Sequence, residues 1–271
     1  RHTTYETQYF ESFFVTEVMR ITYTVIFVFL CFLIAGSCNF INPAEKVPTY
    51  IRIDSFQFIG DSSRGTSSQK ITNVRVNFDN QTIGVFDLPA LIPIIADKRG
   101  VVALTPGVAY DGLTDVQVSY PFFTTDTDTI DPSPGKTIHL TPKTKYYDSS
   151  IFGIEVIDFE GKYYPFISLS GDTSHGLDST DVFEGKYCGR LRLNKKENME
   201  IILPKDFRST SQGFLELNYK CSVPFAVGLQ SNQGSELFVE YIIGVKPSAT
   251  WEKIYIALAD FIFKYPQKDY R

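Results

Sequence analysis

The chain is poor in the residue types that most often carry metal or nucleophilic chemistry. Its 271 residues include only three His, four Cys, two Met and one Trp. The histidines, His2, His139 and His175, are not paired at the spacing of metal ligands, and the cysteines match no zinc pattern. A phosphate-binding P-loop, a dinucleotide fingerprint and a Gly-x-Ser-x-Gly elbow are also missing. The sequence therefore predicts a protein that is not an enzyme, with no catalytic residues.

A strongly basic segment is absent as well. The formal net charge is −5, and Lys and Arg are scattered along the chain. Because affinity for nucleic acid depends on a concentrated positive surface, nucleic acid is excluded as an expected partner.

One long hydrophobic run is present, and it lies near the N-terminus. Residues 21–36 are almost free of polar side chains. This length is typical of a signal-peptide core and is shorter than the roughly 20 apolar residues that a spanning helix needs. We expect Met19 to be the initiator, residues 1–18 to be a non-native upstream leader, and residues 19–37 to form a signal peptide.

The run ends in small residues, Ala35-Gly36-Ser37, directly before Cys38. This arrangement is typical of a lipoprotein signal peptidase site, where the cysteine sulfur receives a diacylglycerol. We therefore predict lipidation of Cys38 by fatty acids such as palmitate, anchoring to an outer membrane, and a tether over residues 38–49. No other cofactor is expected. An ordinary signal peptide or a short membrane anchor is the alternative.

The remainder reads as an all-β protein. The chain has 23 Phe and 16 Tyr, which favour strands. Residues 73–79 alternate so that Val74, Val76 and Phe78 share one face, and Asp79-Asn80 suits a hairpin turn. Residues 50–143 predict a small antiparallel β-sandwich, in which Pro93 breaks a strand and Pro106-Gly107 form a turn.

Residues 144–271 predict a jelly-roll β-sandwich of about eight strands. We expect residues 260–265 to be strand or loop, and the chain to continue beyond Arg271. The strands are expected over 152–159, 163–169, 189–193, 200–203, 214–220, 225–230, 237–244 and 251–258. Cys188 and Cys221 lie in this module, either as a disulfide or as two separate buried thiols.

Several segments resemble a family of uncharacterised lipoproteins from Bacteroidota. They are IRIDSF, GTSSQKITNVRVNFDNQTIGVFDLPA and PGVAYDG, followed by YPFF, VFEGKYCGRLRL, FLELNYK and WEKIYIAL. The resemblance implies a PEGA-like or transthyretin-like β-sandwich followed by a galactose-binding-like jelly roll, and it supplies no catalytic residues. Cys188 departs from the Ser expected beside Gly189. Surface-exported lipoproteins of this phylum often carry an acidic run after the lipidated cysteine. Residues 39–42 lack one, which leaves a periplasmic-facing position open.

Two groups of residues are candidate binding sites. Asp172, Asp178 and Asp181 supply hard oxygen ligands that calcium prefers, although a solvated loop is the stronger reading. Tyr187, Trp251 and Tyr255 offer flat faces on which sugar rings could stack, although Trp251 with Ile254 and Ile256 also reads as a core strand.

Other side chains are candidate catalytic groups. Asp158 and Glu160, with Asp172, could supply paired carboxylates for glycoside hydrolysis, and Ser174-His175 part of a triad. Both readings are weaker than a solvated loop.

These features together predict a non-enzymatic, lipid-anchored envelope protein that acts as a subunit or scaffold of an outer-membrane protein complex. The alternative is a carbohydrate-binding accessory lipoprotein whose partner is a polysaccharide.

Overall fold

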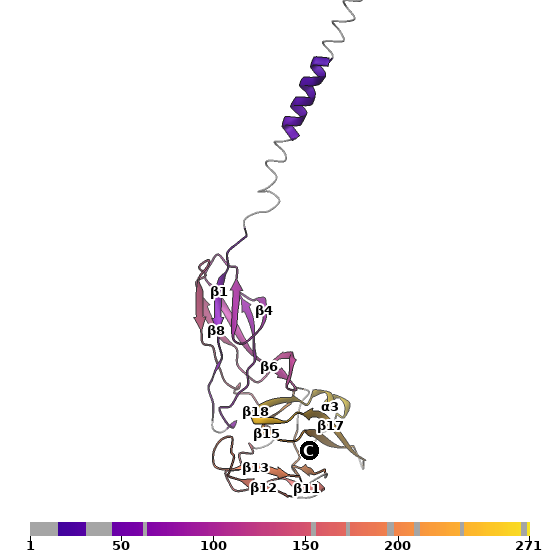
Figure 1. The fold of residues 1–271 in the computed structure, drawn as a ribbon. Coiled ribbons are helices and arrows are strands. Elements are labelled where there is room, and N and C mark those ends of the chain that lie inside the picture. Colours follow the sequence, from indigo (N-terminus) through magenta and orange to yellow (C-terminus); the bar gives the residue numbers. More distant parts are fainter. Residues whose placement is uncertain are drawn as a thin grey trace, which may run out of the picture. The chain divides into compact units, whose positions relative to one another are not determined.

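The computed structural model describes residues 16–30, 45–61, 64–152, 156–171, 174–193, 198–208, 212–233, 236–266 and 270–271 (Figure 1). The chain divides into two compact units, residues 1–47 and 48–271. In the first unit, residues 16–30 form a helix, and Cys31 and Cys38 lie outside the described residues. Among the helices described, none is long and apolar enough to cross a membrane.

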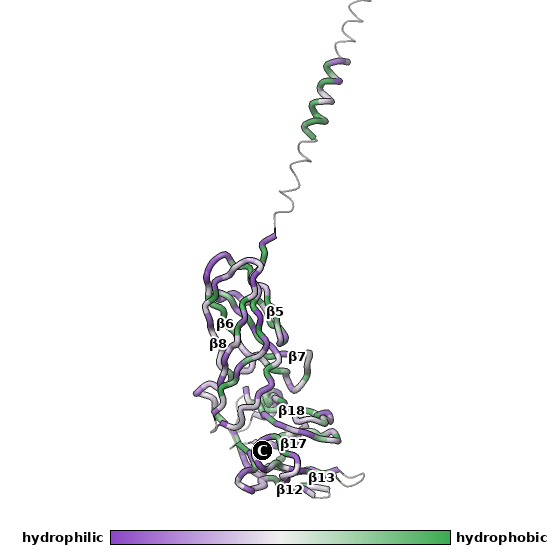
Figure 2. The backbone as a smooth tube through the Cα atoms, turned by 60° about the vertical axis from the view of Figure 1, so that its left-hand side comes forward, coloured by the Kyte–Doolittle hydropathy of each residue, from purple (hydrophilic) through white to green (hydrophobic). Residues whose placement is uncertain are grey.

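Residues 48–271 are built mainly from strands in antiparallel sheets, which confirms the predicted all-β class. Hydrophobic and hydrophilic residues are interleaved along this unit, whereas the helix is mainly hydrophobic (Figure 2).

The first sandwich consists of two sheets. One has the order β5-β1-β9 and the other β4-β3-β6-β7, with β8 also paired to β6. Their bounds are β1 Thr49–Ile53, β3 Asn73–Phe78, β4 Gln81–Asp87, β5 Ala90–Ile94, β6 Gly100–Tyr110, β7 Leu113–Ser119, β8 Asp126–Ile130 and β9 Thr137–Leu140. Unlike the other pairs, β1 and β9 run parallel. A short parallel pair of β2 (Gln57–Phe58) and β10 (Lys143–Thr144) follows them.

The alternating pattern determines the core of this sandwich. Val74 and Val76 are fully buried and Phe78 nearly so, as predicted for one face of β3. Asp79 and Asn80 have φ values of 46° and 64°, which are the left-handed angles of the predicted hairpin turn. The core also includes Ile51 and Ile53 of β1, Ile92 and Ile94 of β5, and Val102 and Leu104 of β6.

Two predictions about proline are wrong. Pro93 lies within β5, opposite Tyr50, because β5 is the edge of its sheet and a proline nitrogen there has no ladder partner to lose. Pro106 lies within the eleven-residue strand β6. On one side β6 changes partner from β8, which pairs as far as Leu104, to β7, which begins at Gly107, so Pro106 falls in the gap.

The rest of the unit contains eight strands in its described residues, paired as four two-stranded antiparallel ladders. Their bounds are β11 Ile167–Ser170, β12 Ser174–Asp178, β13 Cys188–Arg192, β14 Glu200–Ile202, β15 Phe214–Cys221, β16 Phe225–Gln233, β17 Glu236–Val245 and β18 Ser248–Ala257. The pairs are β11–β14, β12–β13, β15–β18 and β16–β17.

Three local predictions fail in this module. Residues 260–265 are not strand or loop, because Ala259–Lys264 form helix α3, which buries Phe261 and Ile262. Strand β12 occupies a segment predicted as a polar loop. Of the strand predicted over 152–159, the described residues 152 and 156–159 form no strand, and residues 153–155 lie outside the described part.

The pair β15–β18 has apolar contacts on both of its faces. Ile254 and Ile256 on one face pack against Val245 of β17 and neighbouring side chains of β16. Tyr255 on the other face joins Val108, Tyr120, Phe123 and Tyr146, which belong to the first sandwich and the segment just after it. This pair therefore connects the first sandwich to the C-terminal strands.

Candidate functional site

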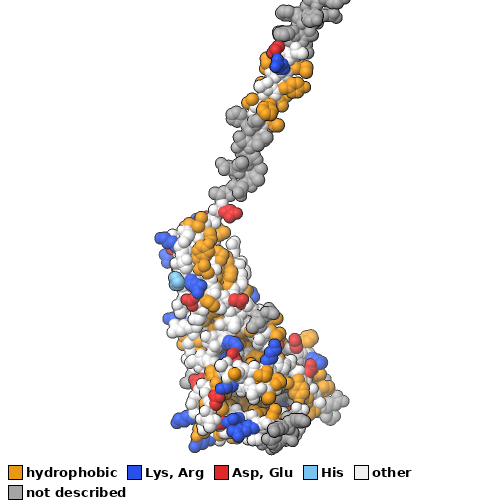
Figure 3. All heavy atoms as spheres, in the orientation of Figure 1, with side chains coloured by type: hydrophobic (Ala, Val, Ile, Leu, Met, Phe, Trp, Pro, Cys, Tyr) orange, Lys and Arg blue, Asp and Glu red, His pale blue; other side chains and the backbone are white. Residues whose placement is uncertain are grey.

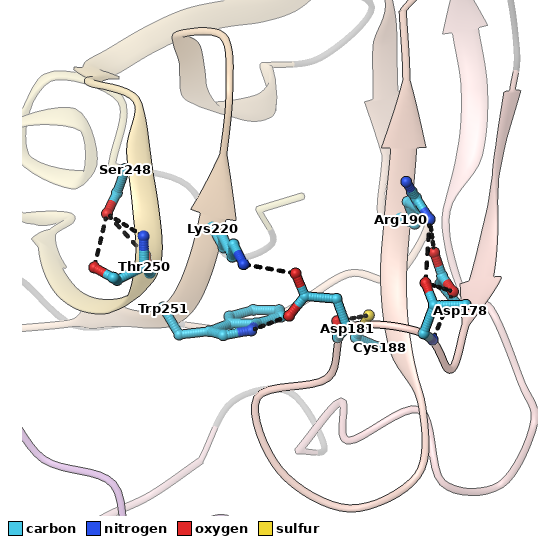
Figure 4. A network of polar contacts seen from close by, with 9 residues as sticks. Asp178, Asp181, Cys188, Arg190, Lys220, Ser248, Thr250 and Trp251 are labelled. Atoms are coloured by element: carbon cyan, nitrogen blue, oxygen red, sulfur yellow. Dashed lines mark hydrogen bonds and ion pairs between the residues drawn. The ribbon is translucent and has the colours of Figure 1, made fainter.

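Two of the predicted calcium ligands lie at the β12–β13 connection, Asp178 as the last residue of β12 and Asp181 in the loop that follows. Asp178 Oδ1 accepts hydrogen bonds from the Thr180 backbone N–H at 2.9 Å and the Thr180 hydroxyl at 2.7 Å, and its Oδ2 pairs with Arg190 (Figure 4). These hydrogen bonds, with the Arg190 charge, lower the pKa of Asp178 well below its usual range. The carboxylate thus closes the turn and ties it to β13.

Asp181 has two partners on β15 and β18. Its Oδ2 accepts a hydrogen bond from Lys220 Nζ at 2.6 Å, and its Oδ1 accepts one from Trp251 Nε1 at 3.1 Å (Figure 4). The hydrogen bonds from Lys220 and Trp251, in that order, lower the pKa of Asp181. This single carboxylate therefore fastens the β12–β13 loop to the β15–β18 ladder.

The predicted calcium ligands are thus paired with basic side chains. Each described carboxylate of the predicted set has its own basic partner, Arg190 for Asp178 and Lys220 for Asp181. Asp172 lies outside the described residues. Across the described part of the chain, no three His, Cys, Asp or Glu side chains gather closely enough to hold a metal ion.

The glycan candidates do not form one platform. Trp251 is partly exposed, and its ring centroid lies 5.7 Å from that of Phe183, which is 37% exposed. The core reading therefore holds for Ile254 and Ile256 but not for Trp251. Tyr187 is partly buried, with Lys162 Nζ 5.9 Å from its ring centroid. No contact between Tyr187 and Trp251 is described.

The prediction of Tyr255 as a glycan contact is wrong. It is only 2% exposed, because it is part of the aromatic cluster under the first sandwich. Its ring centroid lies 4.8 Å from that of Tyr120, and its hydroxyl accepts a hydrogen bond from the Lys70 backbone N–H at 3.1 Å. A buried ring with a satisfied hydroxyl presents no face to a ligand.

A polar network beside Tyr255 was not predicted from the sequence. Glu216 of β15 accepts hydrogen bonds from the hydroxyls of Tyr120 at 2.7 Å and Tyr146 at 2.8 Å. Its other oxygen lies 2.6 Å from Lys253 Nζ, which also donates to the Ser68 carbonyl oxygen at 2.9 Å. Glu216 and Lys253 occur in alternating strands, where charged side chains usually face water, so no local pattern indicated their burial.

The electrostatics of this network follow from burial. Loss of contact with water, followed by the negative charge of Glu216, raises the pKa values of Tyr120, Tyr146 and Tyr255 far above the ordinary tyrosine value. The two hydroxyls that contact Glu216 therefore stay protonated and act as hydrogen-bond donors. Each joins residues of the first sandwich region to β15.

The candidate catalytic carboxylates have structural partners. Glu160 Oε1 accepts hydrogen bonds from the backbone N–H groups of Lys186 at 2.6 Å and Tyr187 at 3.0 Å, which lower its pKa. Asp158 accepts a hydrogen bond from the Glu160 N–H at 3.0 Å. Both side chains therefore stabilise turns. His175 stacks on Tyr164 with centroids 5.0 Å apart and lies in β12, opposite Leu191.

Cys188 and Cys221 are free thiols of intermediate exposure. Cys188 Sγ donates to the Asp181 carbonyl oxygen at 3.3 Å, and Cys221 Sγ to the Lys246 carbonyl oxygen at 3.8 Å. Of the two readings left open, the structure has separate thiols, and they are partly rather than fully buried.

The fold and these contacts define an all-β protein whose strand modules are tied together by buried polar contacts. No protein-family model, curated protein or solved structure matches the chain.

Proposed function

We propose that the protein is a non-enzymatic, lipid-anchored scaffold or subunit of an outer-membrane protein complex, with residues 48–271 acting as one rigid body. The observation that carries this proposal is the network around Glu216, in which side chains from both parts of the unit converge on one carboxylate. A scaffold has to hold its surfaces at fixed positions, and this network supports that role.

Burial of charge makes the network selective for one arrangement. Only 7% of the Lys253 side chain and 20% of the Glu216 side chain are exposed. Separating the two modules would remove the Tyr120 and Tyr146 donors from Glu216. It would also remove the Ser68 acceptor from Lys253, and lost partners of buried charges are costly. We propose that the network is retained for this fixed registration rather than for chemistry.

The lipid anchor is proposed on the sequence. The segment Ala35-Gly36-Ser37-Cys38 and the resemblance to Bacteroidota lipoproteins support it, and the segment lies outside the described residues. The side chains that reach the surface of residues 48–271 are a mixture of hydrophobic and charged groups, as on the face drawn in Figure 3.

Mass spectrometry of the protein extracted from membranes tests the anchor. We expect fatty acids on Cys38, their loss in Cys38→Ser, and no change in Cys31→Ser. An unmodified Cys38 in membrane-extracted protein contradicts the anchor. Affinity purification after chemical cross-linking tests the scaffold role separately, and recovery of uncross-linked single chains contradicts it.

Carbohydrate binding is the second candidate function, and the Trp251–Phe183 pair favours it. The hydrogen bond to Asp181 fixes the indole, and a fixed aromatic face can stack on a sugar ring. Calorimetry against a polysaccharide panel tests this candidate. We expect binding that Trp251→Phe weakens and that Tyr163→Phe, at a 71% exposed tyrosine, leaves unchanged. Absence of binding across the panel contradicts this candidate.

A further inference from the structure

Strand β17 has one open edge. Among the described residues its ladder partner is β16 alone. The opposite edge of β16 is occupied by the C-terminal residues: the Gln230 N–H donates to the Arg271 carbonyl oxygen at 2.7 Å, and the Arg271 N–H donates back at 2.9 Å. At Gln230, which is paired with Val239, this two-stranded sheet can therefore extend only from β17.

The exposed face of β17 is apolar. Leu237, Val239 and Tyr241 are 58%, 45% and 58% exposed, and they alternate with Phe238 and Glu240 on the other face. The ladder with β16 has an irregularity between Val227 and Gly228, so Ile243 and Val245, further along the strand, lie on the opposite face and pack against Ile254 and Ile256. Leu237, Val239 and Tyr241 therefore lie on the face turned away from this core.

The segment of β17 from Leu237 to Tyr241 has few of the features that protect an edge. The sequence of the strand, ELFVEYIIGV, contains no Lys, Arg or Pro. Edge strands of soluble proteins commonly carry such residues because they oppose pairing with another chain. Glu240 is the one charged residue between Leu237 and Tyr241, and the irregularity of the β16–β17 ladder lies beyond Tyr241, so residues 237–241 are suited to accept a further strand.

We propose that β17 pairs antiparallel with β17 of a second copy of this chain, around a two-fold axis at Val239. In this register Leu237 of each copy lies opposite Tyr241 of the other, and the two Val239 side chains are adjacent, so the exposed apolar residues cover one another. Glu240 falls opposite Phe238. A shift that centres the axis on Glu240 would place two carboxylates opposite each other, which is unfavourable.

The charges on the reverse face permit this pairing. Glu240 already forms an ion pair with Lys264 of its own α3, at 2.7 Å. Because both copies use the same edge of β17 around a two-fold axis, the interaction is isologous and closes at two copies. This proposal goes beyond the scaffold function and does not depend on the lipid.

Sedimentation of the full chain in detergent over a range of concentrations tests the proposal. We expect a reversible dimer that Val239→Lys weakens by about tenfold or more, equivalent to at least about 1.4 kcal/mol. Val85→Lys is the matched control, because Val85 is also 45% exposed and lies on an edge strand, β4. This variant should dimerise like the wild type.

A cross-linking measurement identifies the contact. Val239→Cys should give a covalent dimer with a short thiol-reactive cross-linker in cells and in detergent, at a yield above those of the wild type and Val85→Cys. A monomer at every concentration overturns the proposal, as does a dimer that Val239→Lys leaves unchanged. Cross-linking of Val239→Cys to a different protein instead of to itself also overturns it.

Discussion

The ammonium nitrogen of Lys253 lies 2.6 Å from a carboxylate oxygen of Glu216, and 7% and 20% of the two side chains are exposed. The residues occupy neighbouring strands, β18 and β15, where Asn218 is directly opposite Lys253 and Tyr255 is opposite Glu216. The pair is therefore diagonal across the ladder. Tyr120 and Tyr146 complete the coordination of the carboxylate from the first sandwich region.

Glu216→Gln should lower the free energy of unfolding by about 3–5 kcal/mol, because it leaves the buried Lys253 charge without its counter-ion. The exposed pair Lys70–Glu252 supplies the control, and Glu252→Gln should cost no more than about 1 kcal/mol. Urea unfolding measures both. The double variant Glu216→Leu/Lys253→Met should lose less stability than Glu216→Gln. Equal stability of Glu216→Gln and Glu252→Gln contradicts the role of the pair.

Tyr120→Phe should reduce stability at neutral pH by about 1.5–3 kcal/mol, since it removes a hydrogen bond to a charged acceptor. Burial raises the pKa of Tyr120 in the folded chain, so above about pH 10 this tyrosine ionises only in the unfolded chain. The wild type should therefore lose stability as the pH rises above that value. Tyr120→Phe should lose less over this interval. Urea midpoints measured from neutral pH to about pH 11 check this, and parallel curves for the two proteins exclude it.

Trp251 is the only tryptophan in the chain, so its fluorescence reports on Asp181. Because hydrogen bonds lower the pKa of Asp181 in the folded chain, its stabilising effect is present above about pH 4 and lost as the pH falls further. The emission should shift to longer wavelength during acid titration as the loop detaches. Asp181→Ala should show the shifted emission already at neutral pH. Asp54→Ala, at an exposed partner of Arg52, should titrate like the wild type.

Gly107→Ala tests the close approach of β6 to its neighbours. A Cβ at Gly107 would lie 1.9 Å from Asn73 Oδ1 and 2.8 Å from the Val118 carbonyl oxygen. Since Asn73 is 2% exposed and cannot move into solvent, we expect a loss of about 1–3 kcal/mol. Gly244→Ala is the matched control in β17, where no atom lies within 4 Å of the added carbon. Thermal unfolding that affects both variants equally argues against this explanation.

The strand pattern was predictable where side chains alternate. The alternation of Val74, Val76 and Phe78 predicted the buried face of β3, and Asp79-Asn80 predicted its turn, because both features depend on local geometry alone. The predicted strand break at Pro93 and turn at Pro106 were wrong, because the effect of a proline depends on which side of a strand has a partner. That information is absent from the local sequence.

The same distinction between local and distant contacts applies to the candidate site. The acidic loop residues and Trp251 were identified separately, as calcium and glycan candidates, and the structure joins Asp181 to Trp251 by a hydrogen bond. The residues are 70 positions apart, so no local pattern could connect them. Tyr255 lies in the same strand as Trp251, yet it is buried because the first sandwich packs against it.

The sequence by itself determined the all-β class, the buried faces of individual strands and the hairpin turn at Asp79-Asn80, since strand period and turn chemistry act over a few residues. Only the tertiary structure decided that Glu216 and Lys253 are withdrawn from water and that Leu237, Val239 and Tyr241 remain exposed. Burial of a strand face depends on which distant segment packs against it, and that is a property of the assembled chain.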